Sequence, residues 1–348
     1  MPTDPSQGVA FSAPPTGHLP ERMPDWHAIW IFLELYRHGS FRACERELRI
    51  TVSSIRRSVS KLEKDLNARL LTRHPDGIRL TPEGHRVAAV GAEMEQQVLG
   101  LLRAHDALAP GEQGTVRIAV TEGLGAIWLT PQMVEFQRRS PGLRIDLSCG
   151  MTSADVLRME ADLAVQVTRP EALDVKVVRL GYMHLMPYAS AGYIAEYGRP
   201  TSPAELATHR LAIQIAEQAA TVENLNRIFA GAPFTGTIAN TTNASSAHIL
   251  AIANGAGIGW LPTYVSPLRT GLVAIDCGAT ARVDIWLTYH PDVEQIPRVR
   301  RVIDWLRTSF DAKRYPFFGE GFIAPGELPA LDRFAPLKDL FQQFLPPA

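Results

Sequence analysis

Cysteine is scarce in this 348-residue chain, which contains only Cys44, Cys149 and Cys277. Because the three are odd in number and far apart, they exclude a disulfide scaffold and favour a reducing compartment. The longest apolar stretch, 247–262, is interrupted by a histidine and an asparagine, so it is too short to span a bilayer. No basic segment followed by an apolar one opens the sequence. We therefore expect no export signal and a cytoplasmic location.

Signatures of catalysis and of metal binding are also absent. The sequence has no Gly-x-Ser-x-Gly, His-Glu-x-x-His or Cys-x-x-Cys motif, and its ten histidines show no ligand spacing. Gly255, Gly257 and Gly259 resemble half of a dinucleotide fingerprint, but they follow a predicted helix, whereas the fingerprint follows a strand. We interpret them as the end of a helix, and Cys149 as a buried thiol rather than a redox sensor. We expect no enzyme, no cofactor and no metal.

The formal net charge of −1 is a cancellation between two parts of the chain. Residues 37–86 contain 12 Lys or Arg and 6 Asp or Glu, a net charge of +6, which leaves −7 for the remainder. Such a division is typical of a small nucleic-acid-binding module attached to an acidic domain. A solvated basic helix face explains the same count equally well.

Three short helices are predicted around this basic window. The first covers 26–36 and ends at Gly39. Ser40 caps the second and Thr51 caps the third, along which apolar residues recur at helical spacing. The turn between the last two is only about three residues long, which is typical of a helix-turn-helix arrangement.

The third helix has a polar outer face that suits the major groove of DNA. Short hydroxyls near its start allow a close approach, and guanidinium groups can bind a phosphate or a guanine bidentately. Residues 70–73 and 78–80, with turn residues between them, predict a hairpin wing whose arginines contact phosphates. The candidate DNA-binding residues of the helix and the wing are Thr51, Val52, Ser53, Arg56, Arg57, Lys61, Arg73 and Arg79.

A long helix follows, from a Thr81 cap with proline at the first helical position to about Leu108. Its apolar residues recur every three or four positions. The length of the helix and its Pro-Gly ending favour pairing with another helix over burial in a domain core. The predicted dimerisation residues are Val87, Val90, Met94, Val98 and Leu101.

Strands and helices alternate in the rest of the chain. Strands at 115–120, 143–149 and 163–167, separated by helices of which the first covers 127–138, predict an α/β lobe with a parallel sheet. A second lobe is expected at about 168–270, and the chain then returns to the first. Ligands bind such sheets beyond the carboxyl ends of the strands. The candidate ligand-binding residues there are Thr121, Glu122, Thr152, Ser153, Thr168, Gln214 and Thr242. The alternative for each is an ordinary helix cap or turn residue.

Four stretches occur in the order and spacing of a known family. They are Gly39-Ser40-Phe41, the 51–63 helix ending in Lys-Leu-Glu, Leu70-Leu-Thr-Arg73, and Leu80-Thr-Pro-Glu-Gly84. Together they resemble the winged N-terminal domain of the LysR-type transcriptional regulators. The resemblance continues through the strand at 115–120, the segment 162–165 and the segment 255–262, and leaves out both ends of the chain.

The resemblance implies a sequence-specific DNA-binding transcriptional regulator that works as a dimer of dimers, a homotetramer. It also implies a periplasmic-binding-protein-like effector domain of two α/β lobes with a small molecule between them. The implied partners are double-stranded promoter or operator DNA, the effector, other copies of the chain and RNA polymerase, with no membrane.

Some family positions match this chain and others differ. Thr121 and Thr152 stand where the family binds effectors with hydroxyls, and Arg57 keeps the family arginine. Val52 stands where the family usually has a glutamine, and an apolar valine favours contact with a thymine methyl. Arg56 stands where the family has a serine, and an arginine favours a guanine or a phosphate. Glu122 stands beside a site that often takes carboxylates. It either indicates an amine-bearing or neutral effector or points away from the site.

We predict a disordered leader (1–24), a winged helix-turn-helix domain (25–81), a linker and dimerisation helix (82–110), an effector-binding domain (111–311) and an aromatic-rich extension (312–348). The extension holds six of the thirteen phenylalanines. We therefore expect it to dock on its own effector domain or on a neighbouring subunit. The alternative function is a solute-binding or catalytic α/β protein whose N-terminal helices are only an assembly arm.

Overall fold

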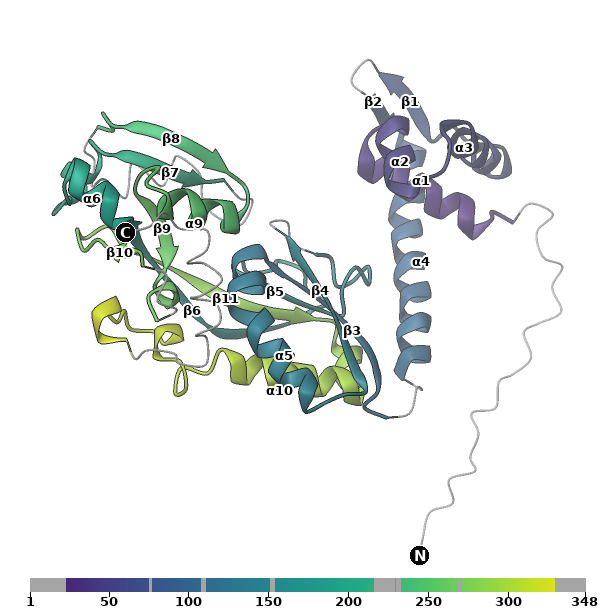
Figure 1. Cartoon of the computed structure of the whole chain (residues 1–348). Coiled ribbons are helices and arrows are strands. Elements are labelled where there is room, and N and C mark those ends of the chain that lie inside the picture. Colours follow the sequence, from purple (N-terminus) through teal and green to yellow (C-terminus); the bar gives the residue numbers. More distant parts are fainter. Residues whose placement is uncertain are drawn as a thin grey trace, which may run out of the picture. The chain divides into compact units, whose positions relative to one another are not determined.

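The computed structural model describes residues 23–74, 77–107, 111–150, 154–215, 229, 233–267 and 271–328 (Figure 1). The chain divides into two compact units, Met1–Val98 and Leu99–Ala348, and the division falls within one helix. The predicted leader lies outside the described residues except for its last two positions, 23 and 24. No helix in the described ranges combines the length and the apolar character needed to cross a membrane.

The first unit begins with the three predicted helices, α1 (Trp26–His38), α2 (Phe41–Leu48) and α3 (Val52–Leu66). Gly39 ends α1 in the left-handed region, with φ of 67°, where a glycine avoids strain. The side chains of Ser40 and Thr51 accept backbone N–H groups of the first turns of α2 and α3. All three predicted capping residues are therefore confirmed.

The predicted wing is an antiparallel pair of strands, β1 (Leu71–His74) and β2 (Gly77–Leu80). The start of β2 contacts the α1–α2 turn, because the backbone N–H of Ile78 donates to the Gly39 carbonyl at 3.0 Å. A Cβ at Gly77 would lie 2.5 Å from that same carbonyl oxygen. The close approach of β2 to this turn therefore requires the glycine.

The start of α4 (Pro82–Ala107) is fastened to the segment before the wing. The Thr81 hydroxyl donates to the Arg69 carbonyl at 2.6 Å and accepts the backbone N–H of Gly84 at 2.9 Å. The Thr81 N–H donates to the Leu70 carbonyl at 3.0 Å. A Cβ at Gly84 would lie 2.2 Å from the Leu70 carbonyl oxygen, so the Thr-Pro-Glu-Gly sequence combines a helix cap with a position that admits no side chain.

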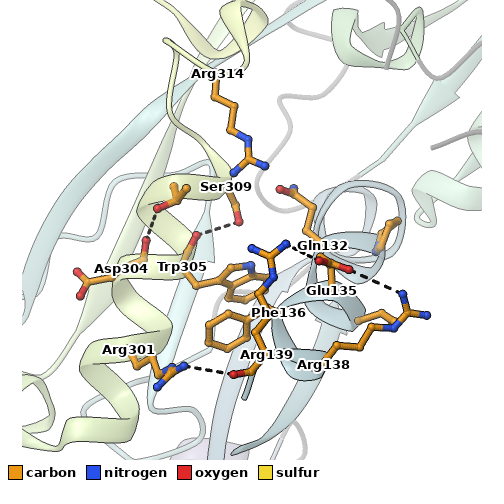
Figure 2. Close-up of a pocket in the computed structure, with 13 residues that line it drawn as sticks. Gln132, Glu135, Phe136, Arg138, Arg139, Arg301, Asp304, Trp305, Ser309 and Arg314 are labelled. Carbon is orange, nitrogen blue, oxygen red and sulfur yellow. Dashed lines mark hydrogen bonds and ion pairs between the residues drawn. The ribbon is translucent and has the colours of Figure 1, made fainter. Parts of the chain in front are cut away.

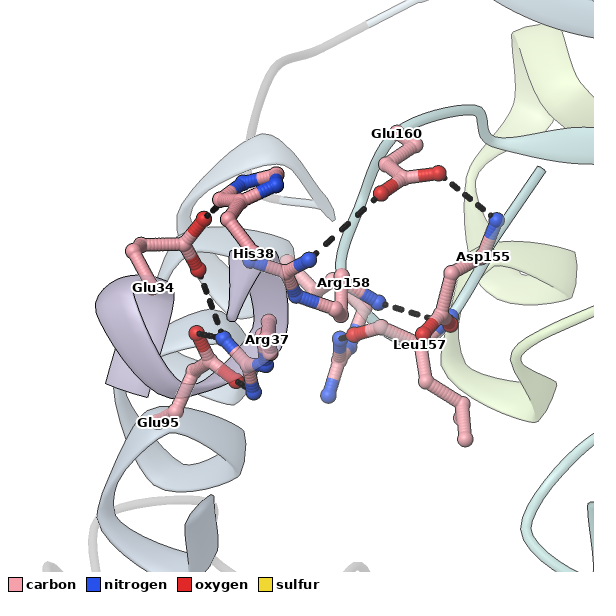
Figure 3. A network of polar contacts seen from close by, with 9 residues as sticks. Glu34, Arg37, His38, Glu95, Asp155, Leu157, Arg158 and Glu160 are labelled. Carbon is pink, nitrogen blue, oxygen red and sulfur yellow. Dashed lines mark hydrogen bonds and ion pairs between the residues drawn. The ribbon is translucent and has the colours of Figure 1, made fainter. Parts of the chain in front are cut away.

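Helix α4 also packs along α1 within this unit. A Cβ at Gly91 would meet Ile29 at 3.0 Å. Glu95 lies one turn further along α4. Its buried carboxylate accepts both terminal nitrogens of the Arg37 guanidinium on α1, at 2.9 and 2.5 Å, and the same guanidinium also binds the buried Glu34 at 2.7 Å (Figure 3). These carboxylates raise the pKa of Arg37. The network is a charge-assisted joint between the long helix α4 and α1.

The second unit is built on a mixed sheet. Among the described residues it has seven strands, in the order β10-β6-β11-β5-β3-β4 with β9 also paired to β6. Their bounds are β3 Gly114–Thr121, β4 Leu143–Gly150, β5 Leu163–Gln166, β6 Lys176–Ala189, β9 Gly259–Pro262, β10 Val273–Ala274 and β11 Ala281–Tyr289. Strand β3 is parallel to β4 and to β5, whereas β11 is antiparallel to β5 and to β6.

The parallel-sheet prediction is right for β3, β4 and β5 and wrong for the rest of the sheet. The strand β6 has no counterpart in the sequence-based prediction, and it pairs with β11 at one end and with β9 and β10 at the other. The helix expected between β4 and β5 is also wrong, because the described residues 154–162 form turns. The predicted return of the chain to the first lobe is confirmed, since β11 pairs directly with β5.

A helical layer of α5 (Thr130–Arg138) and α10 (Pro297–Ser309) packs against this sheet (Figure 1). The helix α5 is preceded by a π-helical turn, η1 (Leu124–Leu129). The rings of Phe136 and Trp305 stack at 5.0 Å between α5 and α10. Short 3-10 turns complete the unit: η2 Thr263–Val265, η3 Pro291–Gln295, η4 Pro316–Phe318 and η5 Pro325–Glu327.

A smaller sheet pairs β7 (Arg210–Gln214) in parallel with β8 (Thr237–Thr242). Beside it lie α6 (Ala191–Tyr197) and α9 (Ser245–Ala253) (Figure 1). A short helix, α7 (Pro203–Leu206), precedes β7 in the chain. Helix α9 ends in the glycine-containing segment and leads into β9, with Gly255 at φ of 81°. The interpretation of this segment as a helix end is confirmed.

The described part of the C-terminal extension packs on the rest of the second unit of its own chain. Tyr315, Phe317 and Phe318 are buried and surround Trp128, at ring-centroid distances of 4.7, 5.3 and 5.0 Å. The Trp128 indole donates to the Ser309 carbonyl at 3.0 Å. The docking prediction is confirmed for these residues, whereas the phenylalanines at 334, 341 and 344 lie outside the described residues.

The Gly84 contact generates a stability prediction. Gly84→Ala should lower the free energy of unfolding of the winged unit by about 1–3 kcal/mol, because the new methyl group overlaps a backbone carbonyl. The matched control is Gly100→Ala on the same helix, where the nearest neighbour of the new Cβ is an arginine nitrogen 3.8 Å away. Denaturant unfolding should show the control as stable as wild type or more so. Equal stability of Gly84→Ala and wild type would contradict the packing described.

Candidate DNA-binding surface and effector site

Exposed hydroxyls cluster at the start of α3. The Thr51 Oγ1 atom lies 2.9 Å from Ser53 Oγ and 3.0 Å from Ser54 Oγ, and it also accepts the Ser54 backbone N–H at 3.3 Å. All three side chains are exposed. A helix start with short hydroxyls can come close to phosphates and base edges, and its backbone N–H groups attract negative charge.

The cations of α3 differ in their surroundings. The Arg56 guanidinium lies 5.3 Å from the centre of the Phe41 ring, a cation–π arrangement that holds it against α2. Lys61 is 3.9 Å from the Asp25 carboxylate, with both side chains at least half exposed. Arg57 is exposed and has no hydrogen bond or ion pair with the described residues. Of the three, Arg57 is therefore the least committed to the protein itself.

Two carboxylates position α3 and the wing from inside. Glu45 on α2 accepts the Val52 backbone N–H at 3.0 Å, so it fastens the first residue of α3 to the preceding helix. Glu63 at the end of α3 accepts the Leu70 N–H at 2.8 Å and the Leu71 N–H at 3.4 Å, which fixes the start of the wing. Val52, whose side chain is half-buried, is therefore the first residue of a helix whose position is set by Glu45.

Two arginines of the wing, Arg73 and Arg79, are candidate DNA-binding residues, and the structure describes the side chain of Arg79. Arg79 is exposed on β2, opposite Thr72, whose hydroxyl donates to the Arg79 carbonyl at 3.3 Å. Arg73 lies on β1 opposite Ile78, but its side chain is outside the described residues.

The predicted dimerisation residues of α4 fall into two groups. Val87 is partly buried and packs against the core of the winged unit. Val90, Met94, Val98 and Leu101 are exposed, with Leu101 at 70%. These four form an apolar stripe on the helix, which we call the α4 stripe.

Three predicted effector residues converge at the N-terminal end of α9. Gln214 and Thr242 face each other across β7 and β8, at the carboxyl ends of both strands. The Gln214 amide donates to Ser245 Oγ at 2.8 Å, and Thr242 Oγ1 accepts the Ala244 N–H at 3.2 Å. Parallel strands that end beside a helix start form the arrangement that binds ligands in α/β proteins.

Glu122 reaches this cluster from the large sheet. Its carboxylate accepts the Ser246 backbone N–H at 3.1 Å, although 124 positions separate the two residues. The next residue, Gly123, comes so close to Ser245 that an added Cβ would lie 3.0 Å from both the Cβ and the Oγ of that serine. Of the two alternatives for Glu122, the structure therefore favours the one in which its carboxylate faces the candidate residues at α9.

The remaining candidates lie at the ends of neighbouring strands. Thr121 ends β3, and its buried hydroxyl has no hydrogen-bond partner among the described residues. Thr168 is exposed two positions beyond β5, and its carbonyl accepts the Gln166 amide at 3.0 Å. Thr152 and Ser153 lie outside the described residues, but β4, which precedes them, ends at Gly150 opposite Thr121.

Two titratable groups near this cluster have shifted pKa values. Burial lowers the pKa of His248 on α9 to about 4, against an ordinary value of 6.5. The Cys149 residue is exposed, so its interpretation as a buried thiol is wrong. Its pKa is nevertheless raised, first by the desolvation of the sulfur and then by the Glu122 carboxylate, which disfavours a reactive thiolate.

The unit also has an open groove of about 640 Å³ between α5 and α10, away from the predicted effector residues (Figure 2). The Phe136 and Trp305 rings lie in it, and four arginines line it. Arg139 pairs with Glu135 at 2.6 Å, and Arg301 pairs with Glu112 and donates to the Arg139 carbonyl at 3.4 Å. Arg138 is 3.8 Å from the same Glu135, and Arg314 lies over the Tyr315 ring. The arginines of the groove are thus engaged with the protein itself.

Two family models match the sequence. Residues 26–85 match the bacterial regulatory helix-turn-helix protein model of the lysR family, and residues 109–311 match the LysR substrate binding domain. The second match alone covers more than half of the chain. The chain belongs to the LysR family. The sequence-based resemblance, the α/β fold class and the winged helix-turn-helix are thereby confirmed.

Curated relatives of this LysR-family protein are named as regulators. A transcriptional regulator of Xanthomonas campestris is 33% identical over 184 residues, 52% of each chain. The regulatory protein IrgB of Vibrio cholerae is 28% identical over 243 residues, 70% of this chain and 81% of the relative. The chain spans about half the length of the first relatives that it matches, including 58% of the Escherichia coli activator AaeR.

Solved structures share the fold. Full-length AphB, a virulence activator of Vibrio cholerae, aligns with a TM-score of 0.52 at 21% identity, over 81% of this chain and 98% of that one. Full-length CbnR complexed with its target DNA aligns with a TM-score of 0.50 at 18% identity, over 82% and 99%. At these identities the similarity establishes the architecture of the LysR-family protein.

Several important residues escaped the sequence analysis. Glu45 and Gly123 belong to none of the quoted motifs: Glu45 acts on the first residue of the next helix, and Gly123 acts through its close approach to Ser245. Phe41 was part of a family motif, but only its contact with Arg56 explains its role. Glu63 and Gly84 were part of the family motifs, but only the hydrogen bonds and the short contact to Leu70 explain their roles. A search for acidic residues one helix before each predicted N-cap would have found Glu45.

The shifted His248 pKa predicts a pH dependence of stability. The folded protein keeps this histidine neutral down to about pH 4, whereas the unfolded chain takes up the proton near pH 6.5. The contribution of neutral His248 to the free energy of unfolding is therefore complete above pH 6.5. It is lost as the pH falls toward 4, by up to about 3 kcal/mol.

His248→Gln removes the titration and keeps an amide donor for the Trp260 carbonyl, which His248 contacts at 3.3 Å. The measurement is denaturant unfolding of the second unit, which contains His248. The difference in its free energy of unfolding between wild type and variant should shrink or reverse between pH 6.5 and 4. A constant difference across this range would show that the histidine does not titrate as described.

Proposed function

We propose that this LysR-family protein is a sequence-specific, DNA-binding transcriptional regulator whose activity is modulated by a small-molecule effector. The proposed partners are double-stranded promoter or operator DNA, the effector, other copies of the chain and RNA polymerase. A regulator of this kind acts in the cytoplasm without an enzymatic step of its own. The predicted segments, with the second lobe of the effector domain at about 168–270, form part of the proposal.

The exposed polar face of α3 is the observation that supports it most. Its start presents hydroxyls, its outer side presents Arg56 and Arg57, and Glu45 and Glu63 hold the helix and the wing from behind. A helix held rigidly with donors on its exposed side is what major-groove recognition needs. The wing arginines would add contacts to phosphates.

Within this face we assign different roles to the cations. Arg56, held over the Phe41 ring, is pre-positioned for a guanine or a phosphate. Arg57 can reorient toward DNA without breaking a hydrogen bond or ion pair with the described residues. Val52, at the first position of α3, would lie against a thymine methyl.

Self-association is proposed through the α4 stripe. An apolar row exposed on a long helix is stabilised by pairing with the same row of a second copy. We propose a dimer on this basis, and a dimer of dimers as the active form. Effector binding would then shift the population between assemblies that differ in the spacing of their recognition helices and in DNA bending.

The alternative is a solute-binding or catalytic α/β protein with an assembly arm. It predicts only weak, nonspecific retention of DNA, whereas the regulator predicts a selected site bound at physiological salt. Selection from a random duplex pool by the full-length protein, followed by gel shifts over a range of salt concentrations, separates the two.

Arg57→Ala should weaken binding to the selected DNA by about 5- to 100-fold and should reduce the slope of log K against log salt concentration by about 1. The reason is the loss of one exposed guanidinium contact. Arg307→Ala, which removes an exposed arginine from α10, is the matched control and should leave both quantities unchanged. An unchanged affinity and slope for Arg57→Ala would exclude α3 as the DNA-contacting helix.

A further inference from the structure

The N-terminal end of α9 needs a partner that its own segment does not supply. The first N–H groups of a helix have no acceptor within the helix, and the helix dipole attracts negative charge to that end. At α9 the capping position is Ala244, which has no side-chain acceptor. Such an end, placed beside the carboxyl ends of parallel strands, is suited to binding the carboxylate of a ligand.

In this chain a carboxylate is already there. Glu122, after β3 of the large sheet, accepts the Ser246 N–H at 3.1 Å. Thr242 accepts the Ala244 N–H, and the Gln214 amide is bonded to Ser245 Oγ. These three polar contacts at the start of α9 are therefore already made within the chain itself.

The space beside this contact is also filled. Gly123 approaches Ser245 so closely that even a Cβ would lie 3.0 Å from two of its atoms. This contact and the Glu122 hydrogen bond link the end of β3 in the large sheet to the helix that follows β8 in the small sheet. The two sheets are thus bridged at the place where the effector is expected.

We propose that Glu122 is a built-in ligand: its carboxylate takes the position that an acidic effector would take at α9 and holds the two parts of the effector domain together without an effector. The proposal deepens the proposed function and rests on it for the meaning of the site. It makes Glu122 a specificity-determining residue, which excludes simple carboxylates from this helix end. An effector that acts here is a neutral or cationic molecule that binds beside Glu122 or draws it away from α9.

A plain structural cap would give the same hydrogen bond, so the test must distinguish a ligand-like carboxylate from a stabilising side chain. Full-length wild type and the variants Glu122→Ala, Glu122→Gln and Glu171→Ala are compared by thermal unfolding in sodium acetate and in sodium chloride of equal concentration. Glu171 is an exposed carboxylate of the same unit and serves as the matched control.

Glu122→Ala should lower the Tm of the effector unit by about 2–4 °C, and acetate, but not chloride, should restore at least half of the loss. Wild type and Glu171→Ala should respond equally to the two salts. Glu122→Gln, whose amide still fills the site, should show no rescue by acetate. If Glu122→Ala does not fold, Glu122→Ser takes its place with the same expected rescue.

Equal responses of all variants to acetate and chloride would overturn the proposal, and so would stabilisation of wild type by acetate to the extent seen in the alanine variant. DNA binding by the same preparations is measured separately on the selected duplex. If acetate rescues Glu122→Ala but no variant binds DNA, the built-in ligand stands and the regulator proposal fails. If the proteins bind DNA but acetate does not rescue Glu122→Ala, the regulator proposal stands and the built-in ligand fails.

Discussion

Carboxylates that accept backbone N–H groups at the start of an element are the interaction on which the candidate sites depend. Glu45 does this for α3, Glu63 for the wing and Glu122 for α9. In each case the donor lacks a partner within its own helix or strand, and the acceptor comes from another element. One type of hydrogen bond therefore sets the position of α3, the start of the wing and the link between the two sheets of the second unit.

A basic surface arises in this nearly neutral chain because its charges are unevenly placed. Residues 37–86 carry a net charge of +6, but Arg37 within this window is paired with the buried Glu34 and Glu95, which lie outside it. Arg57 and Arg79 lie on the exposed side. The positive charge that this unit presents to solvent is therefore carried by exposed arginines such as these, whereas the charge of Arg37 is compensated inside the unit.

Features with a local cause were predictable from the sequence. Ser40, Thr51 and Gly39 act within a turn of their own helix, so their roles follow from residue type and spacing. The strand β6 and the antiparallel direction of β11 depend on pairing between distant segments, which apolar alternation does not encode. The candidate effector residues were found from their place after strands, but whether Glu122 faces α9 or solvent depended on the course of the chain 124 positions later.

The central claim is that α3 is the helix that reads DNA, and cleavage of the DNA by a chemical probe attached to α3 tests it most directly. Ser53→Cys, in a Cys149→Ser background, offers one exposed thiol for an iron chelate among the described residues, since Cys44 and Cys277 are buried. On the selected duplex, the account predicts strong cuts at a few fixed nucleotides facing the major groove, where the start of α3 enters it. Weak cuts spread evenly along the duplex would contradict the assignment of α3 as the helix that reads DNA.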